Sequence, residues 1–213
     1  MKTINKNETV QIIEKKSKFI TYVYYIENVE QAEEKLIELR KKYYDASHHC
    51  YAYRIIKENN ILEKSSDDGE PSGTAGQPIL NVLSKNEIVN VIVIVIRYFG
   101  GTLLGAGGLV RAYSNSAKEA IEKAGKATIE KGIEIKLIMP YQNLESFKKY
   151  CNLNNVAIVD IKFEENIICQ IQVSNRNKDI ITLNETQNRF NIEKMQIMKE
   201  LIIKMTENTE KWH

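Results

Sequence analysis

The chain has 213 residues, 43% of them hydrophobic and 27% charged, which is typical of a folded globular protein and excludes a disordered one. Its 30 basic and 28 acidic residues give a net charge of +2, so binding to nucleic acid or an anionic membrane would require a local patch. The length favours two domains of unequal size. The three cysteines are widely spaced, without a C-x-x-C pair, and we expect buried thiols in a reducing compartment.

The N-terminal sequence MKTINKNETVQ contains no apolar segment typical of a secretory signal. The longest apolar run, residues 89–96, is far shorter than the roughly 20 residues that cross a bilayer. We therefore expect a soluble, cytoplasmic protein.

The first half of the chain begins with two segments rich in β-branched and tyrosine residues, 9–14 and 19–26, joined by a charged turn. This pattern predicts a hairpin. A helix follows, for which Asn28 is the predicted N-cap, Gln31 completes a capping box, and Asp45 marks the end.

Two further strands and a helix are predicted before a change of texture near Thr128. Residues 49–56 have strand character, and the β-branched run 89–98 is typical of a central strand covered on both faces. The pattern over 108–124 is helical, and Gly125 stands where a C-terminal cap is expected.

The second half shows a repeating order of short elements. The order is strand 132–139, helix 141–152, strands 156–163 and 167–173, helix 178–190, and a final segment within 192–205. This βαββαβ order is typical of a ferredoxin-like domain. The final segment also has helical spacing, and a strand is favoured because it completes the topology. We predict an α+β protein with domains 1–129 and 130–213.

Eight of the ten glycines lie between Gly69 and Gly108, which indicates a shaped surface. The polar stretch 57–77 is long for a connection and predicts a functional or disordered loop. Its segment SSDDGEPSGTAGQP is typical of solvated turns that cap backbone donors. The alternative is that its acidic residues hold a cation or a basic partner, with hydroxyls from Ser72 and Thr74 beside them. It matches no known metal-loop spacing, so no metal is predicted.

The segment RYFGGTLLGAGGLVRAY, residues 97–113, combines a strand, a glycine loop and a helix. The free N–H groups of a helix start favour an anion or phosphate, and Arg97 and Arg111 would flank that position. The Gly100–Arg111 loop lacks the features of a P-loop or a dinucleotide fingerprint, so no cofactor is predicted. A packing role for these glycines is an equally good interpretation.

The segment DASHHCYAYR enters a strand with two histidines and a cysteine. His48 and His49 would point to opposite faces and therefore cannot easily bind one metal. A structural role is favoured over catalysis, and Cys50 has no activating neighbour that would make it a nucleophile.

Lys15, Lys16 and Lys18 cluster in the first hairpin turn. Such charge runs usually only face water, and that interpretation is favoured. The alternative is a phosphate-binding patch formed together with Arg97 and Arg111.

Four motifs, KSKF, HHCYAYR, SSDDGEPSGTAGQPIL and RYFGGTLLGAGGLVRAYS, closely resemble the signature of the IMPACT/YigZ family in order and spacing. The resemblance spans roughly residues 17–124, and the tail from Lys131 resembles the accessory C-terminal domain of bacterial members. It implies an N-terminal mixed sheet with helices on one face, as in GHMP kinases and domain four of elongation factor G. It also implies a ferredoxin-like C-terminal domain.

Eukaryotic members of this family regulate translation during amino-acid starvation, a stress response, and carry an additional N-terminal RWD domain. The resemblance therefore implies a regulatory protein that binds RNA, the ribosome or a translation factor, rather than an enzyme. A hydrolase or transferase acting on a phosphorylated or peptide substrate at the same surface is the alternative. The ligand-binding residues implied by the matching motifs are His49, Tyr51, Arg54, Asp67, Asp68, Glu70, Ser72, Thr74, Gln77, Arg97, Tyr98, Gly100, Gly101, Gly105, Gly107, Gly108 and Arg111.

Overall fold

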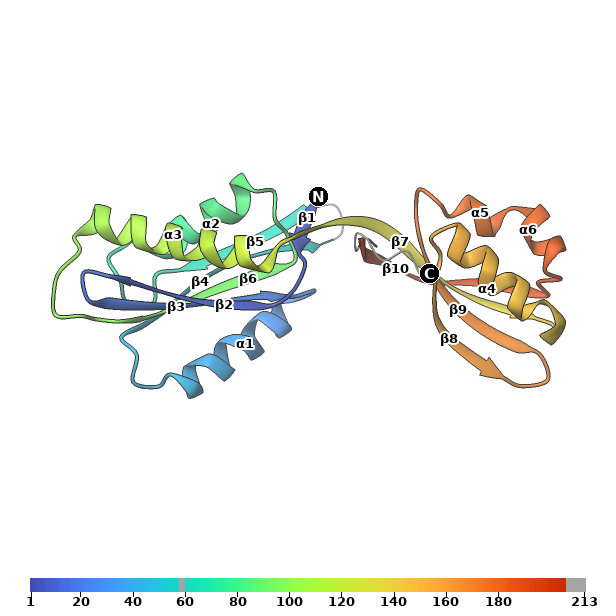
Figure 1. Ribbon diagram of the computed structural model, residues 1–213, viewed down its shortest axis with the longest axis horizontal. Coiled ribbons are helices and arrows are strands. Elements are labelled where there is room, and N and C mark those ends of the chain that lie inside the picture. Colours follow the sequence, from blue (N-terminus) through green and yellow to red (C-terminus); the bar gives the residue numbers. More distant parts are fainter. Residues whose placement is uncertain (58–59, 206–213) are drawn as a thin grey trace. The chain divides into compact units, whose positions relative to one another are not determined.

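The computed structural model describes residues 1–57 and 60–205. These residues form two compact units, Met1–Thr128 and Ile129–Met205 (Figure 1), which we propose are the two domains expected from the sequence. No helix among the described residues is long and apolar enough to cross a membrane.

The first unit is built on one five-stranded sheet. Its strands are β2 (Glu8–Glu14), β3 (Ser17–Tyr25), β6 (Val91–Tyr98), β4 (His48–Lys57) and β5 (Asn60–Ser66), in that spatial order. Every pair of neighbours is antiparallel. The predicted central position of the apolar run is confirmed, because β6 lies in the middle of the sheet.

Helices cover both faces of this sheet. Helix α1 (Val29–Lys42) lies on one face, and α2 (Gly76–Lys85) and α3 (Ala106–Ala124) lie on the other (Figure 1). Alternate residues of β6 enter two separate hydrophobic cores, one with α1 and one with α2 and α3. The predicted α+β class is confirmed, whereas the expectation of a mixed sheet with helices on one face is wrong. A continuously apolar central strand needs cover on both sides.

Helix α1 begins as its sequence predicts. The Asn28 Oδ1 accepts a hydrogen bond of 2.9 Å from the Gln31 amide. The Gln31 side chain accepts one from the Glu27 amide rather than from Asn28, so the capping box reaches one residue further back. The helix ends at Lys42, earlier than Asp45, because Tyr43 leaves the helical region.

The polar stretch after β4 is not one long loop. Residues 60–66 form the edge strand β5, and α2 begins at Gly76, while residues 58–59 lie outside the described residues. An edge strand with exposed side chains carries no apolar alternation, so its sequence resembles that of a loop. Helix α2 was not predicted because its N-cap residue, Ala75, has no capping side chain of its own.

The second unit has the predicted ferredoxin-like order. It contains β7 (Lys126–Met139), a 3₁₀ turn (Tyr141–Asn143), α4 (Leu144–Leu153), β8 (Ala157–Phe163), β9 (Ile167–Ser174), α5 (Asp179–Thr182), α6 (Asn184–Arg189) and β10 (Lys194–Met205). The sheet order is β10-β7-β9-β8. The last segment is therefore a strand, as favoured, and the predicted helix 178–190 is two short helices separated at Leu183.

Strand β7 begins in the first unit, where its residues 126–128 pair with β1 (Lys2–Ile4). The rest of β7 pairs with β9 in the second unit. The core of the second unit packs α4 and both short helices on one face of its sheet through Phe147, Ile181 and Phe190.

Candidate functional site

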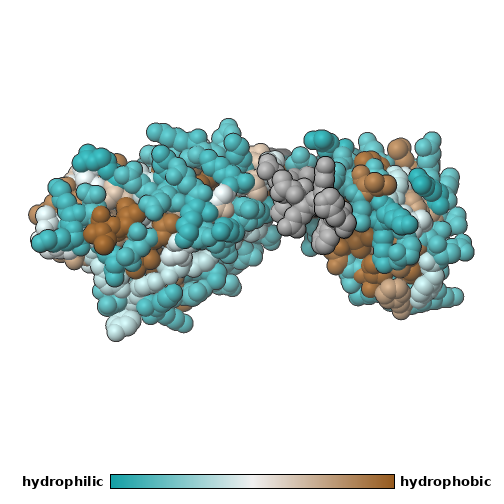
Figure 2. All heavy atoms as spheres, viewed as in Figure 1, coloured by the Kyte–Doolittle hydropathy of each residue, from teal (hydrophilic) through white to brown (hydrophobic). Residues whose placement is uncertain are grey.

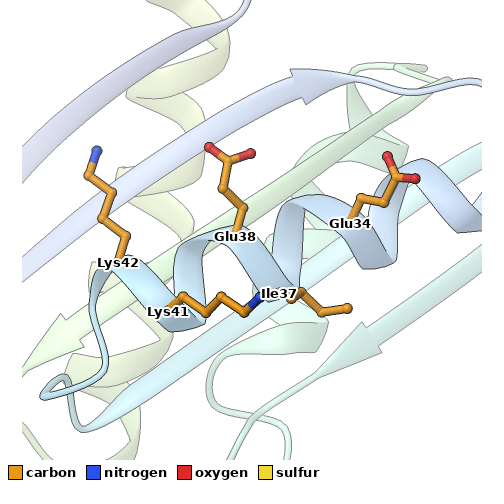
Figure 3. Close-up of a pocket in the computed structure, with 5 residues that line it drawn as sticks. All are labelled: Glu34, Ile37, Glu38, Lys41 and Lys42. Carbon is orange, nitrogen blue, oxygen red and sulfur yellow. The ribbon is translucent and has the colours of Figure 1, made fainter.

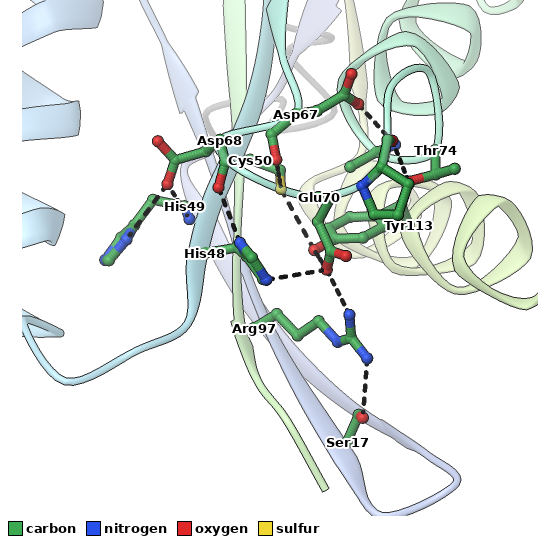
Figure 4. A network of polar contacts seen from close by, with 12 residues as sticks. Ser17, His48, His49, Cys50, Asp67, Asp68, Glu70, Thr74, Arg97 and Tyr113 are labelled. Carbon is green, nitrogen blue, oxygen red and sulfur yellow. Dashed lines mark hydrogen bonds and ion pairs between the residues drawn. The ribbon is translucent and has the colours of Figure 1, made fainter. Parts of the chain in front are cut away.

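The predicted glycine-rich segments meet at one end of the first unit's sheet. There the β2–β3 turn, the start of β4, the 66–75 loop and the end of β6 come together around buried polar side chains (Figure 4). Segments far apart in the sequence therefore share one polar cluster.

Glu70 is the centre of the polar cluster, with only 3% of its side chain exposed. Its Oε1 accepts a 2.5 Å hydrogen bond from the Arg97 Nη1 and a 2.8 Å bond from the Tyr113 hydroxyl. The His48 Nε2 lies 3.8 Å from the same oxygen. A buried charge is tolerated only when it is paired in this way, so Glu70 joins its loop to β6, α3 and β4.

Arg97 connects this cluster to the first hairpin. Its Nη2 donates to the Ser17 Oγ at 3.3 Å, and the Gly100 amide donates to the same oxygen at 3.2 Å. The Arg97 guanidinium lies over the Phe19 ring and over the Phe99 ring, with its carbon 5.5 Å and 5.7 Å from the two centroids. Its buried Nε has no hydrogen-bond partner among the described residues.

Asp67 organises the 66–75 loop from within. Its carboxylate accepts backbone hydrogen bonds of 2.8 to 2.9 Å from Gly73, Ala75 and Gly76 at the start of α2. Burial alone would raise the pKa of Asp67, but these three hydrogen bonds together hold it below its ordinary value. Asp67 thus does the capping expected of a solvated turn.

Asp68 links the same loop to β4 and α1. Its Oδ2 accepts a 2.7 Å hydrogen bond from the His49 amide, and its Oδ1 pairs with Arg40 at 2.9 Å. The Asp68 carbonyl oxygen lies 2.8 Å from the His48 Nδ1. Burial lowers the pKa of His49, although the Asp68 carboxylate opposes that shift. The ring of His49 is therefore held neutral more strongly than that of an exposed histidine.

The two histidines point to opposite faces, as predicted. His48 turns toward Glu70. His49 is two residues from Tyr51 along β4 and so shares its face of the sheet, on which Tyr51 lies in the core under α1. Cys50 donates to the Asp67 carbonyl oxygen and to the Tyr113 hydroxyl. Burial raises the pKa of the Cys50 thiol, which agrees with its predicted lack of reactivity.

The glycine loop after β6 packs directly on the first hairpin turn. A Cβ added at Gly100 would lie 2.0 to 2.3 Å from backbone atoms of Lys16 and Ser17, so only glycine fits there. Lys15 and Lys16 form that turn with φ values of 44° and 64°, a conformation usually left to glycine or asparagine. Gly101 and Gly105 also have positive φ, whereas a Cβ at Gly107 would meet only ordinary contacts.

Several predicted site residues do not join this cluster. Arg54 is six residues from His48 along β4, about 20 Å at the usual strand rise. It is buried and bonds to Glu63 and to the carbonyl oxygens of Leu83 and Ile88, so the structure does not bring it to the cluster. Tyr51 also lies apart from the cluster, in the core under α1.

The remaining predicted residues lie around the cluster. Thr74 is buried and donates to the Pro71 carbonyl oxygen, and the Tyr98 hydroxyl donates to Asp45. Five further predicted residues are exposed, and their part in binding stays a prediction: Ser72, Gln77, Gly105, Gly107 and Arg111. Gly108 is half-buried against Leu104.

Arg97 lies elsewhere than at the predicted flank of the α3 N-terminus. Because its guanidinium is 5% exposed and paired with Glu70, it does not stand free beside the start of α3. Arg111 is exposed and can contact a ligand. One sequence does not show which acidic residue a strand-end arginine meets, so the pairing of Arg97 with Glu70 was not expected.

Three members of the cluster were not predicted from the sequence. They are Ser17, which bonds to Arg97, and His48 and Tyr113, which both lie next to the Glu70 carboxylate. The spacing within each motif is visible in the sequence, but the pairing of Glu70 with Tyr113, 43 residues later, is not.

The surface above the cluster is basic and partly apolar. Lys15, Lys16 and Arg111 are exposed, and exposed Phe99 and Leu103 lie in the adjoining glycine loop. In Figure 2, hydrophobic side chains lie among hydrophilic ones at the end of the first unit where α3 begins.

A shallow hollow beside α1 is a weaker candidate (Figure 3). It is lined by Glu34, Ile37, Glu38, Lys41 and Lys42, all on one helix. The two acidic and two basic side chains offer no convergent chemistry. Among the described residues, no three His, Cys, Asp or Glu side chains are grouped so as to hold a metal ion.

The first unit is thus an antiparallel sheet enclosed by helices, with a buried ion pair under a basic loop surface at one end. Residues 15–121 match the family model described as the Impact N-terminal domain. An IMPACT family member of Haemophilus influenzae is 36% identical over 163 residues, 76% of this chain and 79% of that protein. The chain belongs to the IMPACT family.

Other relatives match a smaller part. IMPACT family member YvyE of Bacillus subtilis is 42% identical over 58% of this chain, and YigZ of Escherichia coli is 40% identical over 51%. The matches span 56% and 54% of those two proteins, little more than half their length. A solved structure of a hypothetical protein covers 92% of this chain, and 95% of its own chain is covered, with 26% identity and a TM-score of 0.59.

Proposed function

We propose that this protein is a translation-associated binding protein and that its loop-end surface binds RNA, free or within the ribosome. The loop-end surface comprises the exposed Lys15, Lys16, Phe99, Leu103 and Arg111; Lys18 lies over the Tyr98 ring on the α1 face of the sheet and is not part of it. Membership of the IMPACT family carries the link to translation. The shape and charge of this surface support RNA as the partner.

The observation that carries the proposal is the contact between the glycine loop and the basic turn. Gly100 lies so close to Lys16 that no side chain fits between them, and Ser17 hydrogen-bonds both the Gly100 amide and Arg97. The turn and the loop therefore form one continuous surface, rather than two independent loops.

The charge of this surface suits a polyanion. Lys15, Lys16 and Arg111 supply three positive charges, and Glu14 is an exposed acidic neighbour in the hairpin. The chain as a whole carries only +2. Basic residues gathered on a nearly neutral protein give a local attraction for phosphates, and this attraction weakens as the salt concentration rises.

Strain in the turn supports the same conclusion. Two consecutive lysines in left-handed conformation cost about 1–2 kcal/mol each relative to ordinary backbone. Such strain persists at sites where a particular side chain is needed at the tip. A glycine turn would be more stable and would lack both charges.

The test is binding to ribosomes and to short RNAs over a salt series. We expect Lys15→Ala/Lys16→Ala/Arg111→Ala to weaken binding and to lower the slope of log affinity against log salt by about 2. The matched control is Lys149→Ala/Arg176→Ala/Lys178→Ala, which removes the same charge from exposed positions of the second unit. No RNA binding at low salt, or equal losses in both triple variants, contradicts the proposal.

The competing function is an enzyme acting on a phosphorylated or peptide substrate. The observation that favours it is the buried Glu70, whose carboxylate lies near His48 and accepts from Tyr113. Such clusters of titratable groups occur at catalytic sites. Turnover of any such substrate in a screen, abolished in His48→Gln, would favour the enzyme; inertness with intact RNA binding favours the binding protein.

A further inference from the structure

Phe99 is a large aromatic residue that remains half exposed to solvent. It follows the last residue of β6 and is 50% exposed, although large apolar side chains gain free energy by leaving water. It also lies in the glycine loop that packs on the basic turn. Proteins that bind single-stranded nucleic acids combine exposed aromatic rings with lysines in this way.

The Phe99 ring is held in place by Arg97. The guanidinium carbon lies over the ring, 5.7 Å from its centroid, which is the distance of a cation–π contact. Arg97 is itself fixed by hydrogen bonds to Glu70 and Ser17 and is only 5% exposed. The cation thus covers one face of the ring from below, while half of the residue remains open to solvent.

The backbone around the ring lets a ligand approach. A Cβ added at Gly101 would meet no atom of the described residues within 4 Å, and the φ of this glycine is 80°. Leu103, 81% exposed, lies two residues further on. The exposed Lys15 and Lys16 lie at the turn on which Gly100 packs.

We propose that an unpaired base of RNA stacks on the open face of Phe99 while Lys15 and Lys16 contact the flanking phosphates. This inference rests on the proposed function and specifies its substrate class. The faces of bases in a duplex are already covered by their neighbours, so a stacking platform selects single-stranded segments. The protein therefore prefers single strands or loops to a helix of equal charge.

The experiment compares a 24-nucleotide oligouridylate with a blunt RNA duplex of 12 base pairs, which carries about the same charge, using the full chain. Phe99→Leu keeps an apolar side chain and removes the ring. We expect it to bind the single strand about tenfold more weakly, with duplex binding unchanged. Phe99→Trp keeps a ring and is expected to bind at least as tightly as the parent.

A spectroscopic readout follows stacking directly. An oligonucleotide with one 2-aminopurine should change its fluorescence on binding the parent and lose that change with Phe99→Leu. The matched control is Phe163→Leu, which replaces a phenylalanine of the second unit that is 64% exposed, and it should alter neither measurement. Far-ultraviolet circular dichroism of each variant checks that the fold is kept.

The outcomes separate this inference from the proposed function. If Phe99→Leu binds the single strand as the parent does, or if Phe163→Leu loses as much, stacking on Phe99 is refuted while RNA binding stands. The same holds if the parent prefers the duplex. If the parent binds neither RNA at low salt, the proposed function fails, and a protein partner on this surface becomes the better explanation.

Discussion

Replacing Glu70 by glutamine should destabilise the first unit strongly. The substitution keeps the shape of the side chain and removes its charge, which leaves the Arg97 guanidinium buried without a counter-ion. Breaking a buried pair by changing one partner costs about 3–5 kcal/mol. Domains of this kind are stable by about 5–15 kcal/mol, so the loss is a large fraction of the total.

The matched control is Glu63→Gln, which removes the charged partner of the other buried arginine. Glu63 pairs with Arg54 at 2.7 Å, but its side chain is 40% exposed and water can replace it. Partly exposed pairs are worth about 0–1 kcal/mol. Arg54 also keeps its hydrogen bonds to two backbone carbonyl oxygens.

The assay must report on the first unit alone, because two units need not unfold together. Hydrogen exchange of peptides from β6 and α3 gives the free energy of opening for that unit. Equal losses in Glu70→Gln and Glu63→Gln would refute the reasoning. Removing both charges together should recover part of the lost stability. A Glu70→Leu/Arg97→Met variant that loses as much stability as the two single variants added together would therefore also refute the reasoning.

Three other outcomes follow from the same geometry. Gly100→Ala forces a Cβ into the backbone of Lys16 and Ser17 and should lower the free energy of unfolding by about 1–3 kcal/mol in a denaturant titration. Gly107→Ala, the control, should leave stability unchanged or raise it slightly. Asp67→Asn should make the free energy of unfolding fall less steeply as the pH is lowered. Folding lowers the pKa of Asp67, so the stability that its carboxylate adds is complete above about pH 4 and is lost as the pH falls toward the folded pKa. All three thiols are buried and should react with a thiol reagent at pH 8 only after unfolding, because burial raises the pKa of each, to about 12 for Cys151 and about 11 for Cys169.

Periodicity in the sequence predicted the elements whose signal is local. The hairpin of β2 and β3, the capped helix α1, the central β6 and the βαββαβ order of the second unit all carry such patterns. The edge strand β5 and the helix α2 do not, because the first is solvent-exposed and the second is capped by Asp67 from nine residues away. A cap so distant in sequence leaves no local signature.

The candidate site was predicted in part for the same reason. The glycines and the acidic residues of the 66–75 loop stand out in composition, so the surface could be located. Its internal pairing could not, because Glu70 finds Arg97 and Tyr113 only after the sheet and α3 have packed. Arg54 was included because it lies in the HHCYAYR motif, and the motif alone does not show that about 20 Å of strand separates it from His48.

The two buried arginines of β4 and β6 show why one end of this sheet is the better candidate for binding. At the far end, the Arg54 Nε bonds to Glu63 and its Nη1 to backbone carbonyl oxygens, so its donors serve the fold. At the loop end, the Arg97 Nε is buried with no partner among the described residues, and the guanidinium lies under an exposed ring. Buried donors are normally satisfied, so an exception calls for an explanation. The guanidinium lies over the buried Phe19 ring and over the half-exposed Phe99 ring, and the proposed base stacking uses the second of these rings.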